Sequence, residues 1–393
     1  MSVAPTRDFG VYIHVPFCSV RCGYCDFNTY APGEVDGATR EGYVEAALGE
    51  MSLAREAMTR DHRPASTVFF GGGTPTMLDP SAIIALLDGA RATWGLAPGA
   101  EISTEANPDS VSADSLQALA SAGFTRVSFG MQSAVPYVLR TLERTHNPDN
   151  VAKAVAWAKE AGLAVSLDLI YGTPGESLAD WHTSLEAAIA LEPDHVSAYA
   201  LVIEPATKMG AQLRRGEIEA VDLDTQADMY EAAEARLAAA GYAWYEVSNW
   251  ARRPGQRCRH NLAYWRSDDW WGIGPGAHSY LGPRTGSEGE PLGAERWWNV
   301  KHPRAYSARI SGGDSPEQER EPLTSADLAL ECVMLRIRLA EGMAIADLPQ
   351  PRPDAIAALI ADGVLDGRVA LGGRILLTLR GRLLADAAVR ALT

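Results

Sequence analysis

The chain has 393 residues, of which 47% are hydrophobic and 22% charged, and its formal net charge is −15 at pH 7. This length and composition fit a large α/β domain with a smaller appendage rather than one average domain. The negative charge argues against nonspecific nucleic-acid binding, because phosphates are repelled unless a basic face is segregated from the rest.

Over the first 245 residues, short runs rich in β-branched or aromatic residues alternate with Ala- and Leu-rich helical stretches. Six such units in series predict a parallel sheet with helices on its outer face, curled into a partial (β/α)6 TIM-type barrel. A full eight-unit barrel is the alternative. The predicted strands are 11–15, 67–70, 101–105, 126–130, 164–170 and 195–202, and the predicted helices are 81–93, 113–122, 151–161, 178–191 and 225–240.

The composition changes after residue 245. Seven of the ten tryptophans lie between residues 242 and 300, among Gly, Pro, Arg and Asn. The stretches 283–290 and 312–322 are predicted to be loops or linkers. We therefore expect three parts: a barrel over residues 1–245, an aromatic-rich segment with a linker over 246–322, and a third unit over 323–393.

The third unit has its own pattern of short elements. Its order resembles a winged-helix module, so the expected fold class is α/β with a C-terminal winged-helix-like α+β domain. The expected elements are a helix over 325–339, a short helix near Ile345, a helix over 353–362, a hairpin through 369–379 and a last helix over 381–392.

No run approaches the ~20 consecutive apolar residues that cross a bilayer, and no signal-peptide apolar stretch precedes the first predicted strand. We therefore expect no transmembrane segment and a cytoplasmic, reducing location. Five cysteines are present, and three of them fall within eight residues. In a reducing compartment this clustering favours metal ligands over disulfides.

The clustered cysteines are Cys18, Cys22 and Cys25, in a loop that directly follows the first predicted strand. Three thiolates on one tight loop can hold three irons of a [4Fe–4S] cubane and leave the fourth iron open. An open coordination position distinguishes a reactive metal centre from a structural one. The alternatives are a Cys3His zinc site that uses His14 or a distant histidine, and thiols without a metal.

The cysteine loop and the stretch Phe-Phe-Gly-Gly-Gly-Thr-Pro-Thr at 69–76 together resemble the radical SAM family of oxygen-independent coproporphyrinogen III oxidases and their relatives. The resemblance covers nearly the whole chain. It implies a [4Fe–4S] cluster and S-adenosylmethionine (SAM), with electron transfer from the cluster that releases methionine and a 5′-deoxyadenosyl radical. The residues that match SAM-contacting positions of the family are Tyr12, Tyr24, Gly72, Gly73, Thr74, Glu105, Gln132, Arg144 and Asp168.

The predicted locations of several of these residues are also typical of a binding site. Glu105, Gln132 and Asp168 lie at or near the ends of predicted strands, which face the mouth of such a barrel. The glycines at 71–73 allow a ligand to approach the backbone closely, although a strand-to-turn glycine run is the plain alternative. Arg144 is assigned to the SAM site only by its spacing from Gln132, with a helical segment between the two residues.

A second motif narrows the family. The sequence His-Asn-Leu-Ala-Tyr-Trp at 260–265 matches the H-N-x-x-Y-W signature of the heme-chaperone, HemW-type branch. His260 would supply an imidazole to heme iron, and Tyr264 and Trp265 would offer flat apolar faces to the ring. The plain alternative is a core histidine beside two aromatic rings. Cys258 is either a second soft ligand or a bystander.

The leading hypothesis is a heme chaperone that binds heme and transfers it to an acceptor hemoprotein of unknown identity. The alternative is an oxygen-independent coproporphyrinogen III oxidase, which performs oxidative decarboxylation to protoporphyrinogen IX. Against it, Phe27 stands where the oxidases carry a further cysteine, and only eleven residues precede Tyr12. A nucleic-acid-binding tail is a third possibility, but residues 351–393 carry only six Arg against four Asp. No catalytic residue is assigned.

Overall fold

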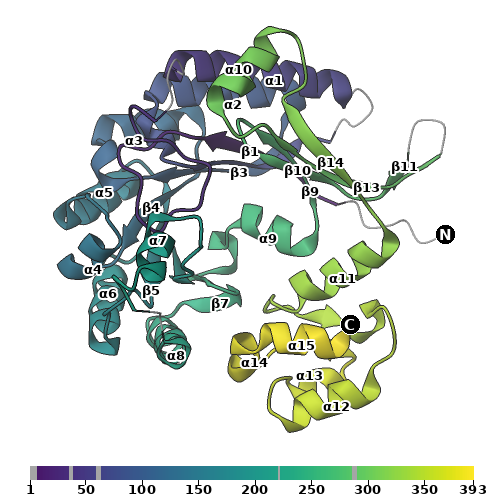
Figure 1. Cartoon of the computed structure of the whole chain (residues 1–393). Helices are drawn as coiled ribbons and strands as arrows, with labels where there is room; N and C mark the ends of the chain where they lie inside the picture. Colours follow the sequence, from purple (N-terminus) through teal and green to yellow (C-terminus); the bar gives the residue numbers. More distant parts are fainter. Residues whose placement is uncertain (1–6, 35–38, 59–62, 220–221, 286–289) are drawn as a thin grey trace.

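The computed structural model describes residues 7–34, 39–58, 63–219, 222–285 and 290–393. Its main sheet has the strand order β14-β13-β10-β9-β1-β2-β3-β4-β5-β6-β8-β7 (Figure 1). The central six strands are parallel and follow one another in chain order. They are β1 (Phe9–Val15), β2 (Ala65–Gly72), β3 (Leu96–Ala106), β4 (Arg126–Gln132), β5 (Ala164–Tyr171) and β6 (His195–Ala200).

Helices connect these strands and cover the outer, convex face of the sheet (Figure 1). This is the expected partial (β/α)6 barrel, and the eight-unit alternative is wrong because the sheet continues beyond β6 with β8 and β7, which pair antiparallel. The helices of this layer are α1 (Arg40–Ala57), α2 (Pro80–Trp94), α3 (Ala113–Ala122), α4 (Pro136–Thr141), α5 (Pro148–Glu160), α6 (Leu178–Ala190) and α8 (Leu223–Ala239). The short helix α7 (Lys208–Arg214) lies instead beside the loop that follows β1, where the Met209 N–H donates to the Gly23 carbonyl at 2.8 Å.

The aromatic-rich segment extends the same sheet instead of standing apart. β9 (Asp269–Ile273) pairs parallel with β1, and β10 (His278–Leu281), β13 (Ala294–Asn299) and β14 (Glu317–Leu323) continue antiparallel from it. The loop expected at 312–322 is therefore partly a strand, and residues 286–289 of the other expected linker lie outside the described residues. The remaining elements are β7 (Ala243–Glu246), β8 (Asn249–Ala251), α9 (Arg259–Arg266), α10 (Pro303–Ser311), and the pair β11 (Arg284–Thr285) and β12 (Pro291–Leu292).

The alternation of side chains along the strands separates the core from the barrel interior. In β1, Val11, Ile13 and Val15 are fully buried, and they belong to the main hydrophobic cluster that also includes residues of the outer helices. Tyr12 and His14 lie on the opposite face, because successive side chains of a strand point to opposite sides. The inner faces of β3 to β6 carry mainly polar side chains, so the interior holds a cavity and not a second apolar core.

The C-terminal unit has its own core, in which Val333, Ile337, Ile375 and Leu392 are buried together. The predicted hairpin through 369–379 is wrong: residues 367–371 are helical because Asp366 caps the backbone N–H groups of Arg368 and Val369. The elements are α11 (Ser325–Arg336), β15 (Met343–Ala344), η4 (Ile345–Asp347), α12 (Pro353–Ala361), α13 (Gly367–Leu371), β16 (Arg374–Ile375), α14 (Leu379–Leu383) and α15 (Ala385–Leu392).

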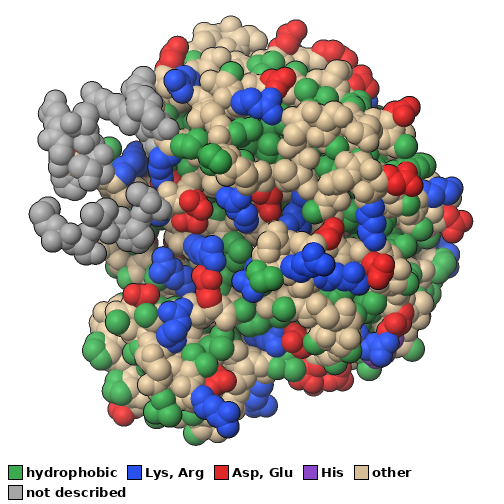
Figure 2. Space-filling model, turned by 180° about the vertical axis from the view of Figure 1, so that it is seen from behind, with side chains coloured by type: hydrophobic (Ala, Val, Ile, Leu, Met, Phe, Trp, Pro, Cys, Tyr) green, Lys and Arg blue, Asp and Glu red, His purple; other side chains and the backbone are tan. Residues whose placement is uncertain are grey.

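This C-terminal unit packs against the barrel beside α8 and α9 (Figure 1). The Arg382 guanidinium lies 4.1 Å from the Trp244 ring centroid and donates to Glu234 at 2.9 Å. On the opposite face, Figure 2 shows Lys and Arg side chains interspersed with acidic ones along the seam between the two parts. A cavity of about 290 Å³ lies there, with Arg266 and Glu341 paired at its wall.

The expected barrel and C-terminal domain are thus confirmed, while the boundaries after residues 245 and 322 stay predictions. Within the described ranges, no helix is both long and apolar enough to cross a membrane.

Candidate functional site

One cavity of about 680 Å³ occupies the interior of the barrel. It reaches from the cysteine loop after β1 to α9, which lies on the concave side of the sheet (Figure 1). This volume is within the range of small-molecule and cofactor sites. The cavity brings together almost all of the site residues expected from the sequence. Those that line it are Tyr12, Cys18, Cys22, Tyr24, Cys25, Gly72, Gly73, Thr74, Glu105, Gln132, Arg144, Asp168, His260 and Tyr264.

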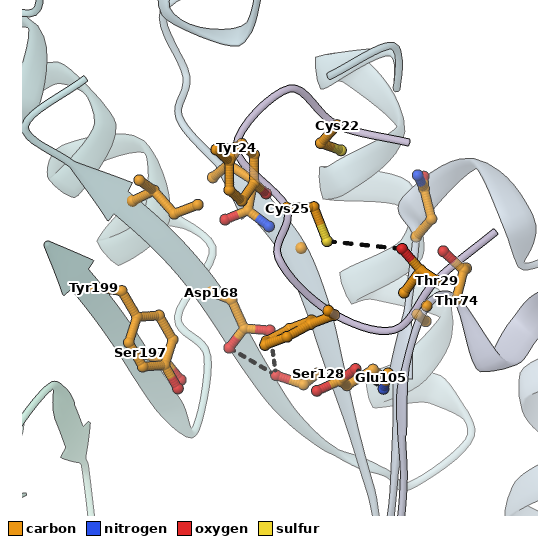
Figure 3. A pocket seen from close by; sticks show the side chains of 18 of the residues that line it. Cys22, Tyr24, Cys25, Thr29, Thr74, Glu105, Ser128, Asp168, Ser197 and Tyr199 are labelled. Atoms are coloured by element: carbon orange, nitrogen blue, oxygen red, sulfur yellow. Dashed lines mark hydrogen bonds between the residues drawn. The ribbon is translucent and has the colours of Figure 1, made fainter. Parts of the chain in front are cut away.

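All three loop cysteines are free thiols that are neither fully buried nor fully exposed. Burial, together with the charge of the neighbouring Cys25 thiolate, raises the pKa of Cys18 to about 11. Burial also raises the pKa of Cys25, whose Sγ contacts the Thr29 hydroxyl at 3.9 Å (Figure 3). Iron binding would supply the positive charge that holds such thiols deprotonated. The donor set fits an iron–sulfur cluster.

Among the described residues, no three Cys, His, Asp or Glu side chains converge closely enough to hold a single metal ion. A zinc site requires such convergence, since zinc–sulfur bonds are only about 2.3 Å long. A [4Fe–4S] cubane does not require such convergence, because each thiolate binds a different iron.

Two glycines at the end of β2 bring that strand directly against the cysteine loop. A Cβ at Gly73 would lie 2.5 Å from the Phe17 carbonyl oxygen and 3.0 Å from Cys18 Sγ. Gly72 has a φ of +110°, and a Cβ there would collide with the His14 ring. These contacts with the chain itself explain why glycine stands at both positions, and the close approach of a ligand to this backbone stays a prediction.

Two carboxylates project into the cavity from the C-terminal ends of β3 and β5. Glu105 Oε2 accepts the Gly72 N–H at 3.1 Å. The Ser128 hydroxyl lies 2.9 and 2.8 Å from the two Asp168 carboxylate oxygens (Figure 3). Burial, followed by the charge of Asp168, raises the pKa of Glu105 to about 8, and burial likewise raises the pKa of Asp168. These groups can accept hydrogen bonds from ligand hydroxyl or ammonium groups.

Gln132 and Arg144 lie on the same side of the cavity as the cysteine loop. Gln132 has a φ of 63°, at a bulge where β4 ends beside β5. Such a left-handed conformation is costly for a non-glycine residue and persists where the surroundings enforce it. Arg144 donates to the Gly130 carbonyl at 2.7 Å and lies 3.8 Å from Cys22 Sγ. Arg144 therefore lies beside a cysteine of the loop, while its contact with SAM stays a prediction.

The two tyrosines occupy different walls. The Tyr12 hydroxyl is 3.0 Å from His14 Nδ1, and its ring stacks on those of Phe69 and His260. Tyr24 lies between two of the cysteines in sequence and packs against the small apolar cluster beside β5 and α4. Tyr12 therefore connects the cysteine side of the cavity with the α9 side.

The H-N-x-x-Y-W motif forms most of α9, and the structure divides it between two faces. His260 and Tyr264 line the cavity, where they hydrogen-bond to each other with 2.8 Å between His260 Nε2 and the Tyr264 oxygen. Trp265 instead packs with Tyr245, Leu262 and Leu339 toward the C-terminal unit. Only part of the motif therefore lines the cavity.

Sequence reasoning missed the polar residues at the far end of the cavity. Glu101 accepts the backbone N–H groups of Arg259 and His260 at 2.9 and 3.2 Å, and thereby fixes the start of α9. Arg126 faces Glu101 at 3.4 Å, and Cys258 is buried beside the same carboxylate. Glu101 and Arg126 are the first residues of two predicted strands, at positions whose side chains point into the barrel. The alternation of side chains along these strands could therefore have indicated both residues.

The stretch 270–278 follows α9 and contacts the cysteine loop from outside the cavity. Its first part belongs to strand β9, and the Pro275 carbonyl accepts a hydrogen bond from Asn28 of the cysteine loop at 2.9 Å. His278 stacks on Trp298 and does not line the cavity. This loop therefore supports the cysteine loop from outside.

Comparisons with known proteins agree with this site. The model of the Radical SAM superfamily matches residues 12–188. A relative named Heme chaperone HemW, from Mycobacterium tuberculosis, is 48% identical over 389 residues, or 99% of this chain and 95% of the relative. The Heme chaperone HemW of Escherichia coli is 39% identical over 334 residues, or 84% of this chain and 83% of the relative.

Among solved structures, coproporphyrinogen III oxidase (HemN) from Escherichia coli, a radical SAM enzyme, is similar with a TM-score of 0.79. It is 22% identical and the match covers 100% of this chain and 91% of that one. At this identity the likeness concerns the fold alone. The comparisons confirm the radical SAM fold and the branch that the sequence motifs indicated.

Proposed function

This chain belongs to the HemW family within the radical SAM superfamily, and on that premise we propose that it acts as a heme chaperone. It binds heme and transfers it to an acceptor hemoprotein. The scaffold carries a [4Fe–4S] cluster and S-adenosylmethionine. The three clustered thiols, which need reducing conditions, favour a cytoplasmic location.

One observation carries the proposal: the cysteine loop and α9 line the same cavity, although about 240 residues separate them in sequence. Beside α9 the cavity wall carries the aromatic rings of Tyr12, Phe69 and Tyr264. Aromatic faces suit a flat apolar macrocycle. A cluster-binding loop and a heme-binding helix can therefore act on one interior space.

At the cluster end, Cys18, Cys22 and Cys25 would hold the iron–sulfur cluster. When bound, the cluster and SAM supply one-electron chemistry. Glu105 and Asp168 would accept hydrogen bonds from SAM, and Gly72 would offer its backbone, which lines the cavity. The other residues proposed around SAM are Tyr12, Tyr24, Gly73, Thr74, Gln132 and Arg144.

At the other end, His260 and Tyr264 would meet the heme. Trp265, on the opposite face of α9, would hold the helix against Leu339 and Tyr245 rather than touch the ring.

Heme titration of the anaerobically reconstituted chain tests the proposal. We expect about one heme per chain, with a Soret shift that survives loss of the cluster in Cys22→Ala. Heme should then pass from the loaded chain to apomyoglobin, used as a probe acceptor. Absence of saturable heme binding would contradict the proposal. Protoporphyrinogen formed from coproporphyrinogen III over many turnovers would favour the oxidase alternative instead.

A further inference from the structure

The imidazole of His260 has no free lone pair in this structure. A neutral imidazole has one unprotonated nitrogen, whose lone pair is its only means of binding iron. His260 Nδ1 lies 2.9 Å from the Thr67 hydroxyl, and Nε2 lies 2.8 Å from the Tyr264 hydroxyl. Whichever nitrogen carries the proton, the other accepts a hydroxyl hydrogen. Both nitrogens are therefore occupied.

Packing fixes the ring in that position. His260 is only 2% exposed, and its ring stacks on Phe69 with 5.0 Å between centroids and 17° between planes. On the β1 side, even a methyl group at Gly10 would lie 3.5 Å from Nδ1. Turning the ring toward a ligand in the cavity would break both hydrogen bonds and this stack.

Tyr264 is placed differently. It is partly exposed to the same cavity, and its ring is held edge-on between His260 at 4.9 Å and Trp270 at 4.7 Å. A phenol oxygen has two lone pairs besides its proton, so it can bind a second partner while it keeps its bond to His260. Tyrosine oxygen is an established type of axial ligand to heme iron.

We infer that Tyr264, and not His260, binds the heme iron, and that His260 is a positioning residue for the Tyr264 oxygen. This rests on the proposed heme binding. On binding ferric heme, the phenol O–H bond breaks as its proton passes to His260 Nε2, an oxygen–iron bond forms, and the Nδ1 proton leaves by way of the Thr67 hydroxyl, so that one proton in all is released to solvent. No electron is transferred.

The contact with Thr67 allows His260 to serve both states of the tyrosine. A threonine hydroxyl can donate or accept. When the Thr67 hydroxyl accepts from His260 Nδ1–H, Nε2 accepts from the phenol of Tyr264. When the Thr67 hydroxyl donates to Nδ1, Nε2–H donates to the phenolate of Tyr264. His260 thus holds the oxygen in one place before and after heme binds, without itself contacting iron.

Ferric heme titrations with optical and EPR spectra test this assignment on the full, reconstituted chain. Tyr264→Phe should lower affinity at least tenfold and remove the phenolate-to-iron charge-transfer band. His260→Gln, which retains a hydrogen-bonding group, should keep that band with a shifted wavelength and lose affinity only several-fold. Tyr280→Phe is the matched control, since Tyr280 lies outside the cavity and stacks on Trp270.

Resonance Raman on the wild type needs no variant and should show enhanced phenolate ring modes. A nitrogen-ligated spectrum in wild type that His260→Gln abolishes and Tyr264→Phe retains would overturn the inference but leave the heme chaperone function intact. Unchanged heme binding and spectrum in Tyr264→Phe would overturn it as well. Failure of the wild type to bind heme would instead overturn the proposed function.

Discussion

Replacing Gly73 by alanine should disturb the cysteine loop more than any other single methyl group near it. The added Cβ would lie 2.5 Å from the Phe17 carbonyl oxygen, about 0.9 Å short of ordinary contact, and 3.0 Å from Cys18 Sγ. The approach is fixed by two backbone hydrogen bonds. Gly73 N–H donates to Val15 at 2.8 Å, and Thr74 N–H donates to Phe17 at 2.7 Å.

The cost follows from these contacts. Neither neighbour is the flexible end of a long side chain, so the strand end and the loop must separate. Overpacking of this kind costs about 1–3 kcal/mol, and each weakened backbone hydrogen bond adds about 1 kcal/mol. We expect the free energy of unfolding of the cluster-free chain to fall by about 2–4 kcal/mol. Cys18 would also move away from the other two thiols.

Two measurements check this prediction. Urea unfolding gives the loss of stability, and iron and sulfide analysis after anaerobic reconstitution gives the cluster content, which should fall well below about four irons per chain. Gly255→Ala is the matched control, because nothing lies within 4 Å of its Cβ position and its φ is ordinary. If Gly73→Ala matched Gly255→Ala in both stability and iron content, the close approach of β2 to Cys18 would be refuted.

Three further predictions concern the cluster, pH and the C-terminal unit. Cys22→Ala should lose the cluster, whereas Cys332→Ala in α11 should retain it, as measured by iron content. Burial raises the pKa of Glu50 to about 7 from an ordinary 4.5, so its stabilising contribution is present below pH ~4.5 and is lost as pH rises through 7. Glu50→Gln should therefore reduce the loss of unfolding free energy between pH 5 and pH 8 by about 2 kcal/mol in urea titrations; an unchanged pH profile would contradict the shift. Arg382→Met removes the cationic partner of Glu234 at the interface, where only the Trp250 indole N–H would still donate to it, and should make unfolding of the C-terminal unit separate from that of the barrel. Arg215→Met, at an exposed ion pair, should have almost no effect.

Much of the fold could be predicted because the barrel is built from local repeats. Most of the parallel strands contain short runs of β-branched or aromatic residues, and several outer helices begin at a capping side chain, as at Ser112 and Ser177. The strands β9, β10, β13 and β14 were missed. Their pairing partners are distant in sequence, and runs such as Glu317–Leu323 are mostly charged and exposed, so no local periodicity marks them.

The site residues that the sequence indicated are those whose chemistry requires particular residue types at short spacing. Three thiolates in eight residues, a glycine run after a strand, and a polar residue at the end of each of several strands are visible without coordinates. Glu101 and Arg126 were not visible as a pair, because an ion pair between neighbouring strands depends on their register.

The sequence by itself determined the chemistry at the cysteine loop and the family of the chain, because those signals lie within a few consecutive residues. Only the tertiary structure decided how the H-N-x-x-Y-W motif is used. Its six residues are adjacent in sequence, but a helix directs side chains that are one residue apart to faces about 100° apart, so Tyr264 meets the cavity while Trp265 meets the C-terminal unit. The hydrogen bonding and stacking of the His260 ring depend in addition on Thr67 and Phe69 from β2. These residues lie nearly 200 positions earlier in the sequence and are brought beside α9 only by folding.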